Sequence, residues 1–411
     1  KTEYETIINK EYKYYTHGIY LKYFIDNMDL YKYEFDVLLI DEAQDMNQIM
    51  YKLIKTIAKK RKTIVLVGDS NQAIYSFLDN IDLLEKLKEN PKVVQKQLLK
   101  SFRFPNGSNI EQKANLILNQ RNKSIIGAAI HENEDINDIL YLGRTNSQVV
   151  MKALELTNNN IINKTKDKFN ILGGLKSLET FYQDLEYLKN FQNKKIKNKV
   201  IAKFKSIEEL EEFAKENEDY EILGGIKMIN ERIPTFLEDN PKFNPKTPSI
   251  EDIFEVIKKF FTLSKKVKIT LSTMHKSKGL GFDKVILMKK INEVNNIYGF
   301  EEEEKPLFEK KLLAPNNDNV YEEFNLLYVA LTRAKKELVI DNDEIMDNLN
   351  LISIDPKKME TTYINQKFLD NYELYIEDNN FYIFESVTKA KYLIGEQAYE
   401  SYKYKMINKD I

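Results

Sequence analysis

The stretch that decides the fold is Val37-Leu38-Leu39-Ile40-Asp41-Glu42-Ala43-Gln44-Asp45, an apolar run that ends in acids and an amide. A short continuous apolar run of this kind predicts a buried strand of a parallel sheet. A helical stretch over roughly 46–60 follows, and a second apolar run covers residues 63–67. Strand, helix and strand in this order are typical of an α/β fold.

The rest of the chain continues this pattern with one long interruption. Further strands are predicted at residues 139–142, 267–272, 284–288 and 337–340. Between about 175 and 262, apolar residues recur at helical spacing and strand signals are scarce. We interpret this part as a mostly helical insertion that splits the second α/β unit.

Composition excludes several classes of protein. The 411 residues are 42% hydrophobic and 31% charged, which is typical of a globular protein of two to four domains. The absence of cysteine excludes disulfides, thiolate metal sites and cysteine nucleophiles. No run approaches the ~20 apolar residues of a membrane span, so we expect no membrane partner and a cytoplasmic location. With a net charge of −2, any binding of nucleic acid must come from a local patch.

Two acids stand at the carboxyl end of the first predicted strand, where open parallel sheets bind ligands. Asp41 suits Mg²⁺, which prefers carboxylate oxygen and water. The adjacent Glu42 is suited to orient or deprotonate a water that attacks a γ-phosphate. The alternative is a charged helix start, where acids are favourable in any case.

The second predicted strand runs into Gly68-Asp69-Ser70-Asn71-Gln72-Ala73-Ile74-Tyr75-Ser76-Phe77. Gly68 permits a sharp backbone turn, and Gln72 is suited to reach a phosphate or the attacking water. The alternative is a simple Gly-Asp turn that leads into an ordinary helix.

These two segments resemble the Walker B and third motifs of superfamily 1 DNA helicases of the UvrD/PcrA/Rep type. Later segments resemble further motifs of the family in the same order. They are residues 98–103 and 110–118 (fourth motif), 142–146 (the RTN element), 171–188 (the entry into the accessory subdomain), 272–280 (motif V) and 322–335 (motif VI). Residues 16–22 are most similar to the F-box DNA helicase branch and its bacterial relatives.

The resemblance implies an α/β protein with two RecA-like P-loop NTPase lobes and with ATP and Mg²⁺ between them. It divides the chain into six parts. They are residues 1–35 (remnant of a helical accessory subdomain), 36–100 (incomplete first lobe), 101–174 and 265–344 (the two parts of the second lobe), 175–264 (helical accessory insertion) and 345–411 (an appendix of unknown role).

The resemblance also assigns roles at the nucleotide. Asp41 would bind Mg²⁺, Glu42 would activate water, and Gln72 would couple hydrolysis to movement. Arg103 and Arg333 would stabilise the developing γ-phosphate charge, and Gly279 of motif V would line the nucleotide site. Arginine suits this task because its planar guanidinium stays charged and binds phosphate bidentately. Arg144 of the RTN element equally fits a role in lobe packing.

Single-stranded DNA or a DNA junction is the partner that the resemblance implies. Tyr75 and Phe77 are candidates for stacking on bases, which is worth ~1–3 kcal/mol per base. Thr273, His275 and Ser277 of motif V are candidates for contacts to backbone phosphates, which position a strand without reading its sequence. The alternatives are that Tyr75 and Phe77 both pack beneath the first lobe and that the histidine is structural.

The chain departs from the family in three places. None of its 13 glycines is followed by lysine, so the phosphate loop that ends in Gly-Lys-Thr is missing. We expect this chain to be the carboxyl-terminal portion of a longer helicase rather than one that has lost the loop. Gly281 stands where the family has a glutamate that contacts the ribose, which puts nucleotide affinity in doubt. Leu78-Asp79-Asn80 replaces Arg-Gly-Ala near the DNA track.

The function that this pattern predicts is an ATP-dependent DNA helicase or translocase that moves 3′ to 5′. We expect the 411 residues by themselves to show no meaningful ATPase activity. The alternative is a catalytically inactive helicase-like module that binds DNA or protein. A fused nuclease has little support, because residues 345–411 contain no recognisable cluster of Asp, Glu and Lys.

Overall fold

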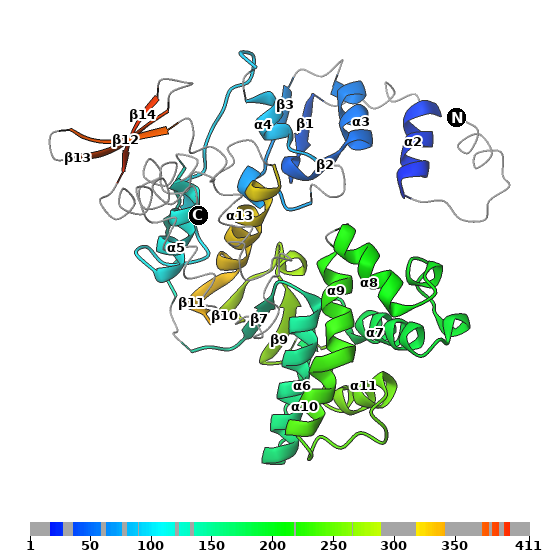
Figure 1. Ribbon diagram of the computed structural model, residues 1–411. Coiled ribbons are helices and arrows are strands. Elements are labelled where there is room, and N and C mark those ends of the chain that lie inside the picture. The colour runs from blue at the N-terminus through cyan, green and yellow to red at the C-terminus, as the bar shows by residue number, and fades with distance from the viewer. Residues whose placement is uncertain are drawn as a thin grey trace. The chain divides into compact units, whose positions relative to one another are not determined.

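The computed structural model describes most of the chain between residues 17 and 341 and three strands beyond it (Figure 1). The described ranges are 17–27, 36–58, 63–75, 80–88, 90–119, 123–131, 135–217, 219–264, 266–288, 318–341, 372–377, 380–385 and 390–394. The chain forms two compact units. The first comprises residues 1–98 and 321–328, and the second comprises residues 99–320 and 329–411.

The first unit contains a two-stranded parallel sheet with helix α3 in the connection. Strand β1 (Val37–Ile40) pairs with β3 (Thr63–Leu66), so that Ile40 lies opposite Leu66. The other described elements are α2 (His17–Asn27), β2 (Met46–Asn47), α3 (Gln48–Ala58), β4 (Asn80–Ile81) and α4 (Leu83–Leu87). Strands β2 and β4 pair antiparallel. The core of this unit is Ile40, Ala43, Met46 and Leu83.

The positions predicted for β1 and β3 are confirmed, but the prediction that both strands are buried is wrong. Leu39 is 71% exposed, Ile64 42% and Val65 39%. Parallel strands become buried when layers cover both faces of the sheet and further strands flank it. The described part of this unit contains no third parallel strand, so apolar side chains of β1 and β3 face outward.

The second unit contains a five-stranded parallel sheet in the order β11-β10-β7-β9-β8, which confirms the predicted α/β class. Its strands are β7 (Ile139–Gly143), β8 (Phe169–Ile171), β9 (Ile269–Thr273), β10 (Phe282–Leu287) and β11 (Ala334–Ile340). A short parallel pair, β5 (Lys100–Ser101) and β6 (Ile126–Gly127), belongs to the same unit, as does α5 (Asn109–Leu118). Helix α13 (Asp318–Leu331) runs directly into β11.

The described residues between β8 and β9 form helices and turns. The helices are α7 (Leu175–Lys189), α8 (Ile207–Glu216), α9 (Tyr220–Lys227), α10 (Ile233–Asp239) and α11 (Ile250–Lys258). Together with α6 (Asn146–Asn163) they gather beside β9 (Figure 1) and share one large core with β8 and β9. Tyr182, Phe254 and Leu210 are among its fully buried members.

Three strands follow near the carboxyl end: β12 (Tyr372–Glu377), β13 (Asn380–Glu385) and β14 (Ala390–Ile394). They form an antiparallel sheet in that order. Across the described ranges, none of the helices has the length and apolar character needed to cross a membrane.

Candidate functional site

The structure brings the two predicted catalytic segments of the first unit to one edge of the sheet. The amide of Val67 donates to the Ile40 carbonyl at 2.8 Å, and the amide of Ala43 donates to the Val67 carbonyl at 3.0 Å. These bonds continue the parallel pairing of β1 and β3 beyond the strands. Asp41 and Gly68 therefore both start loops at the carboxyl edge, as the sequence predicts.

Glu42 has a left-handed backbone, with φ 50° and ψ 43°. This conformation is uncommon for a residue with a β-carbon and costs of order 1–3 kcal/mol. The Glu42 amide donates to Asp41 Oδ1 at 2.9 Å, which stabilises the tight turn. Both acids are exposed. Lys164, Phe191 and Asn244 also have a positive φ. Strain of this kind clusters at functional sites, and at Glu42 it coincides with a residue that the sequence selects.

Gln44, which the sequence analysis did not select, connects the two loops. Its side chain is 1% exposed. Nε2 donates to a Glu42 carboxylate oxygen, and Oε1 accepts the Asp69 amide at 3.1 Å. A β-carbon at Gly68 would lie 2.2 Å from Gln44 Oε1, so the close approach of the loops requires glycine there.

The turn that carries Gln72 is held by Asp69 and by a buried asparagine of α13. Asp69 Oδ1 accepts the Asn71 amide at 2.9 Å, and Oδ2 accepts Gln72 Nε2 at 3.0 Å. Asn325, 5% exposed, donates from Nδ2 to the carbonyls of Ser70 at 3.1 Å and Ala73 at 2.7 Å. The motif VI helix thus stabilises the third-motif turn within the first unit.

Tyr75 is half-buried at the end of the same turn. Burial raises the pKa of its phenol, and the nearby carboxylates of Asp45 and Glu42 raise that pKa further. The ring therefore lies beside the acidic loop. Its role as a base-stacking residue stays a prediction. Phe77, the other candidate for stacking, lies outside the described residues.

The acidic loop fits a magnesium ion that is shared with a nucleotide. Mg²⁺ in such sites takes one or two carboxylates and completes its shell with water and substrate phosphates. Asp41 and Glu42 present exposed carboxylates at the sheet edge. Within the part of the chain that the structure describes, no group of three or more His, Asp or Glu side chains is placed to hold a metal by itself.

The two predicted arginines of the second unit lie against one another's segments. Arg103 Nη1 donates to the Thr332 carbonyl at 2.9 Å. Arg333 is 1% exposed, and its guanidinium donates to the carbonyls of Val329 at 2.8 Å and Leu280 at 3.1 Å. Arg333 thus ties α13 to the end of motif V in this structure. The transition-state role of both arginines stays a prediction.

The motif V turn follows β9. The amide of Met274 donates to the Gly143 carbonyl at 2.9 Å, and Ser277 Oγ donates to the Met274 carbonyl at 2.6 Å. Thr273 and Ser277 are buried, whereas His275 is half-buried. Gly279 is exposed with φ 80°, a conformation that favours glycine. The Ser277 hydroxyl stabilises the turn here, and the predicted DNA contacts of Thr273, His275 and Ser277 stay predictions.

The RTN element is joined to the helical insertion by a half-buried carboxylate. Glu221 of α9 accepts the Asn146 amide at 3.1 Å and Asn146 Nδ2 at 3.1 Å. Burial raises the Glu221 pKa, and the Asn146 bonds and the charges of Arg144 and Lys276 only partly offset this. Lys276 Nζ donates to Asn146 Oδ1 at 3.4 Å, which links motif V to the same point. The sequence carried no signal for Glu221.

The known proteins to which this chain is similar are DNA helicases. Residues 7–92 match the family described as UvrD/REP helicase N-terminal domain. A probable DNA helicase II homolog of Mycoplasma genitalium is 25% identical over 89% of this chain and 62% of its own length. The F-box DNA helicase protein 1 of Schizosaccharomyces pombe is 26% identical over 76% of this chain and 34% of its own. The ATP-dependent DNA helicase PcrA of Bacillus subtilis is 24% identical over 84% of this chain and 60% of its own.

Proposed function

We propose that this chain, which is similar to the UvrD, PcrA and Rep helicases, forms part of an ATP-dependent DNA translocase that moves 3′ to 5′. The chain spans 34% to 62% of the length of the three relatives above, so we propose this activity for the complete gene product. The parallel α/β sheet is consistent with the RecA-like fold of such enzymes.

The observation that carries the proposal is the arrangement at the β1–β3 edge. Acids follow one strand, an amide follows its neighbour, and the buried Gln44 bonds to both loops. A nucleotide γ-phosphate at this edge would face Glu42 and Gln72 together. The unusual backbone of Glu42 supports a catalytic rather than a capping role, because a helix-capping acid needs no left-handed conformation.

In this proposal each residue has one task. Asp41 would hold Mg²⁺, which would neutralise phosphate charge when it is bound. Glu42 accepts the proton of the attacking water, and Gln72 orients that water. By the family resemblance, Arg103 and Arg333 are the groups that stabilise negative charge on the transferred phosphoryl group. The exposed apolar strands β1 and β3 support a first lobe that is completed by further strands.

The test is ATP hydrolysis by the complete gene product with and without single-stranded DNA. Glu42→Gln should lower DNA-stimulated turnover by about 10²- to 10⁴-fold, the usual contribution of a general base, while ATP still binds. Glu85→Gln is the matched control, because Glu85 is an exposed acid of the same unit, where it pairs with Lys88 at 3.5 Å. Equal turnover in the Glu42→Gln variant and the wild type would remove the proposed base.

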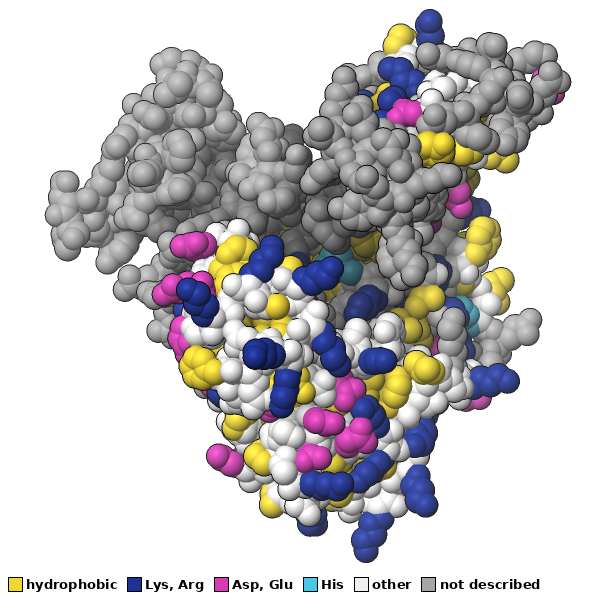
Figure 2. Space-filling model, turned by 90° about the vertical axis from the view of Figure 1, so that its right-hand side faces the viewer, with side chains coloured by type: hydrophobic (Ala, Val, Ile, Leu, Met, Phe, Trp, Pro, Cys, Tyr) yellow, Lys and Arg dark blue, Asp and Glu magenta, His cyan; other side chains and the backbone are white. Residues whose placement is uncertain are grey.

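A second candidate function, DNA binding without hydrolysis, is favoured by a basic segment of the insertion. Residues 187–205 contain seven lysines and no acid. All seven are exposed, and none forms an ion pair within the described structure. Figure 2 views this side and shows numerous Lys and Arg side chains on its described surface. The buried Asp184 holds the segment by accepting the amides of Lys197 at 3.0 Å and Asn198 at 2.8 Å.

Salt dependence of duplex binding tests this segment. Each lysine–phosphate contact steepens the fall of log K with log salt by about 0.9 on duplex DNA. A triple variant, K194Q/K197Q/K199Q, should therefore flatten the slope by up to about 2.7. The matched control replaces three exposed lysines elsewhere, K242Q/K246Q/K266Q. An unchanged slope in the first variant, or equal flattening in both, would exclude the segment as a DNA contact.

A further inference from the structure

The turn that follows α7 places a bulky side chain where helices usually end in glycine. The amide of Phe191 donates to the Leu188 carbonyl at 3.1 Å, and the amide of Gln192 donates to the Tyr187 carbonyl at 2.7 Å. These two bonds form a Schellman motif, whose left-handed position favours glycine because glycine has no β-carbon. Phe191 occupies that position with φ 55°. For a bulky residue this conformation is an outlier and costs free energy.

The Phe191 side chain gains little burial in return for this cost, because it is 76% exposed. A single exposed apolar side chain is ordinary on a protein surface. Here the exposure coincides with strain: among the described residues, Phe191 is the only exposed large apolar residue with a positive φ. Because strain of this kind clusters at functional sites, the ring is a candidate contact for a ligand.

Lysines flank this ring on both sides. Lys189 precedes Phe191 by two residues, and Lys194 and Lys195 follow it by three and four. Consecutive Cα atoms are 3.8 Å apart, so the backbones of Lys189 and Lys194 lie within about 12 Å of that of Phe191. All three lysines are exposed, and within the described residues none has a carboxylate partner. The ring therefore lies in a surface of uncompensated positive charge.

Polar bonds fix the loop that carries these side chains. Asn193 Nδ2 donates to the Phe204 carbonyl at 3.0 Å, and the Lys195 amide donates to the Gln192 carbonyl at 2.9 Å. The buried Asp184 holds the residues that follow. A contact that is ordered before a ligand arrives costs less free energy to order on binding.

A partner that suits both features carries negative charge and a flat apolar face. A nucleic acid has both, because its phosphates attract ammonium groups and each base offers a face on which an aromatic ring can stack. A base inside a duplex is already stacked on its neighbours, and taking it out of the duplex costs free energy. An unpaired base, at a strand end or a junction, is therefore the partner that suits Phe191.

We propose that Phe191 stacks on an unpaired base of a DNA strand whose phosphates lie on the surrounding lysines. This contact rests on the proposed DNA binding by residues 187–205, and it makes that segment select DNA ends and junctions over uniform duplex. An acidic protein surface would pair with the lysines but would offer no base, and the experiment separates the two partners.

The first experiment measures binding of the 411-residue chain to two hairpin DNAs by fluorescence anisotropy. Both carry the same duplex and a short single-stranded tail, which is thymidine in one and abasic in the other, so that the phosphate charge is equal. Wild type should prefer the thymidine tail, and Phe191→Leu should reduce this preference by about 5- to 150-fold, as expected for loss of one stacked base. Phe191→Trp should keep it. Equal affinity of the wild type for both tails would indicate a partner without bases and overturn the proposal, as would an unchanged preference in Phe191→Leu.

Phe191→Gly distinguishes a ligand contact from a structural residue. Glycine relieves the left-handed strain, so this variant should melt at a higher temperature and lose the thymidine preference. Lys164→Gly is the matched control, because Lys164 is an exposed residue with φ 55° at the end of α6. It should also melt higher but keep the preference. A lower melting temperature in Phe191→Gly, or a retained preference, overturns the proposal.

Photocrosslinking locates the contact on the chain, since Tyr75 is another candidate for stacking. A 5-iodouridine in the tail forms a crosslink with an aromatic ring that stacks on it. Digestion with trypsin should place this crosslink in the peptide of residues 190–194, and Phe191→Leu should abolish it there. Crosslinks that are confined to other peptides would contradict a base contact at Phe191.

Failure of the proposed DNA binding looks different from failure of the base contact. If the segment binds DNA, K194Q/K197Q/K199Q should flatten the salt dependence with both tails, whereas Phe191→Leu should leave that slope unchanged. A slope that responds to the lysines, with a thymidine preference that does not respond to Phe191, would overturn the base contact alone. A slope that does not respond to the lysines would remove the proposed DNA binding and the base contact with it.

Discussion

Replacement of Asn325 by alanine should loosen the turn that carries Gln72. Asn325 is buried, and its Nδ2 donates to two carbonyls, those of Ser70 and Ala73. Each such bond contributes about 1 kcal/mol net, and a buried carbonyl left without a donor costs more. Asn325→Ala should therefore lower the free energy of opening this turn by about 2–3 kcal/mol.

The assay is amide hydrogen exchange of peptides that cover residues 68–75. A loss of 2–3 kcal/mol corresponds to exchange that is roughly 30- to 150-fold faster, when exchange proceeds through local opening. Asn115→Ala is the matched control, because Asn115 bonds to both backbone groups of Ile125, at 2.9 and 2.8 Å, in the second unit. It should speed exchange around residue 125 only. Unchanged exchange over 68–75 in Asn325→Ala would refute this reasoning.

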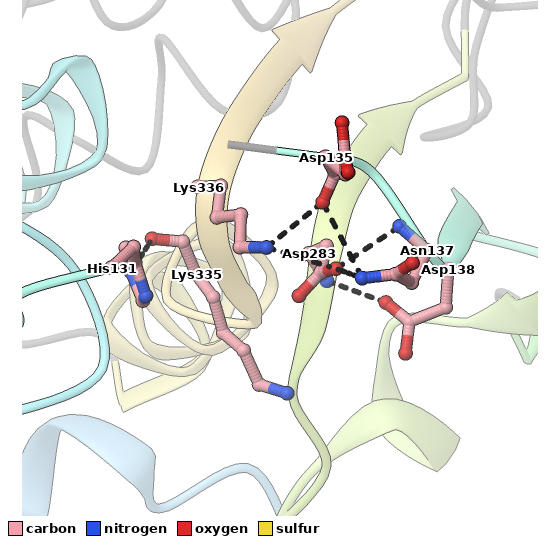
Figure 3. A network of polar contacts seen from close by, with 7 residues as sticks. All are labelled: His131, Asp135, Asn137, Asp138, Asp283, Lys335 and Lys336. Carbon is pink, nitrogen blue, oxygen red and sulfur yellow. Dashed lines mark hydrogen bonds and ion pairs between the residues drawn. The ribbon is translucent and has the colours of Figure 1, made fainter. Parts of the chain in front are cut away.

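Three further substitutions test the packing and the charges. Gly68→Ala places a β-carbon on Gln44 Oε1 and should cost about 1–3 kcal/mol in urea denaturation, whereas unchanged stability would show that the loops can separate freely. Burial opposes ionisation of Asp283, but the Asn137 amide and Lys336 outweigh burial and lower the pKa of this carboxyl (Figure 3). The ionised Asp283 therefore stabilises the fold fully above about pH 4, and this contribution is lost as the pH falls further. Asp283→Asn should remove that part of the acid dependence of the melting temperature, and an unchanged acid profile would contradict the assignment. For Glu221 the dependence of stability on pH has the opposite sign. Because its pKa is raised, stability should increase as the pH falls from that pKa towards about 4.3. Glu221→Gln should abolish this increase in the melting temperature.

The sequence predicted both strands of the β1–β3 sheet and four of the five strands of the larger parallel sheet, because their apolar runs are long enough to be recognised by themselves. Strand β1 occupies the predicted residues, and β7, β9, β10 and β11 overlap their predictions. Strand β8 was missed, because three residues carry too little pattern to be recognised. The helix predicted from residue 46 begins at Gln48, since Met46 and Asn47 pair with β4 instead.

The sequence predicts only those site residues that combine a reactive side chain with a position directly after a predicted strand. Asp41 and Glu42 could be selected because acids directly follow an apolar strand. Gln44 and Asn325 could not, because their importance comes from bonds to residues 25 and more than 250 positions away. The two uncharged amides look ordinary in sequence, and only their burial and partners reveal that they hold the loops together.

The central claim is that chemistry at the β1–β3 edge drives movement along DNA. Its most direct test is strand displacement by the complete gene product with ATP and Mg²⁺, on partial duplexes that carry either a 3′ or a 5′ single-stranded tail. The account predicts displacement from the 3′-tailed duplex alone and its loss in Glu42→Gln with DNA binding intact. Displacement that persists in Glu42→Gln, or that never requires ATP, would contradict it.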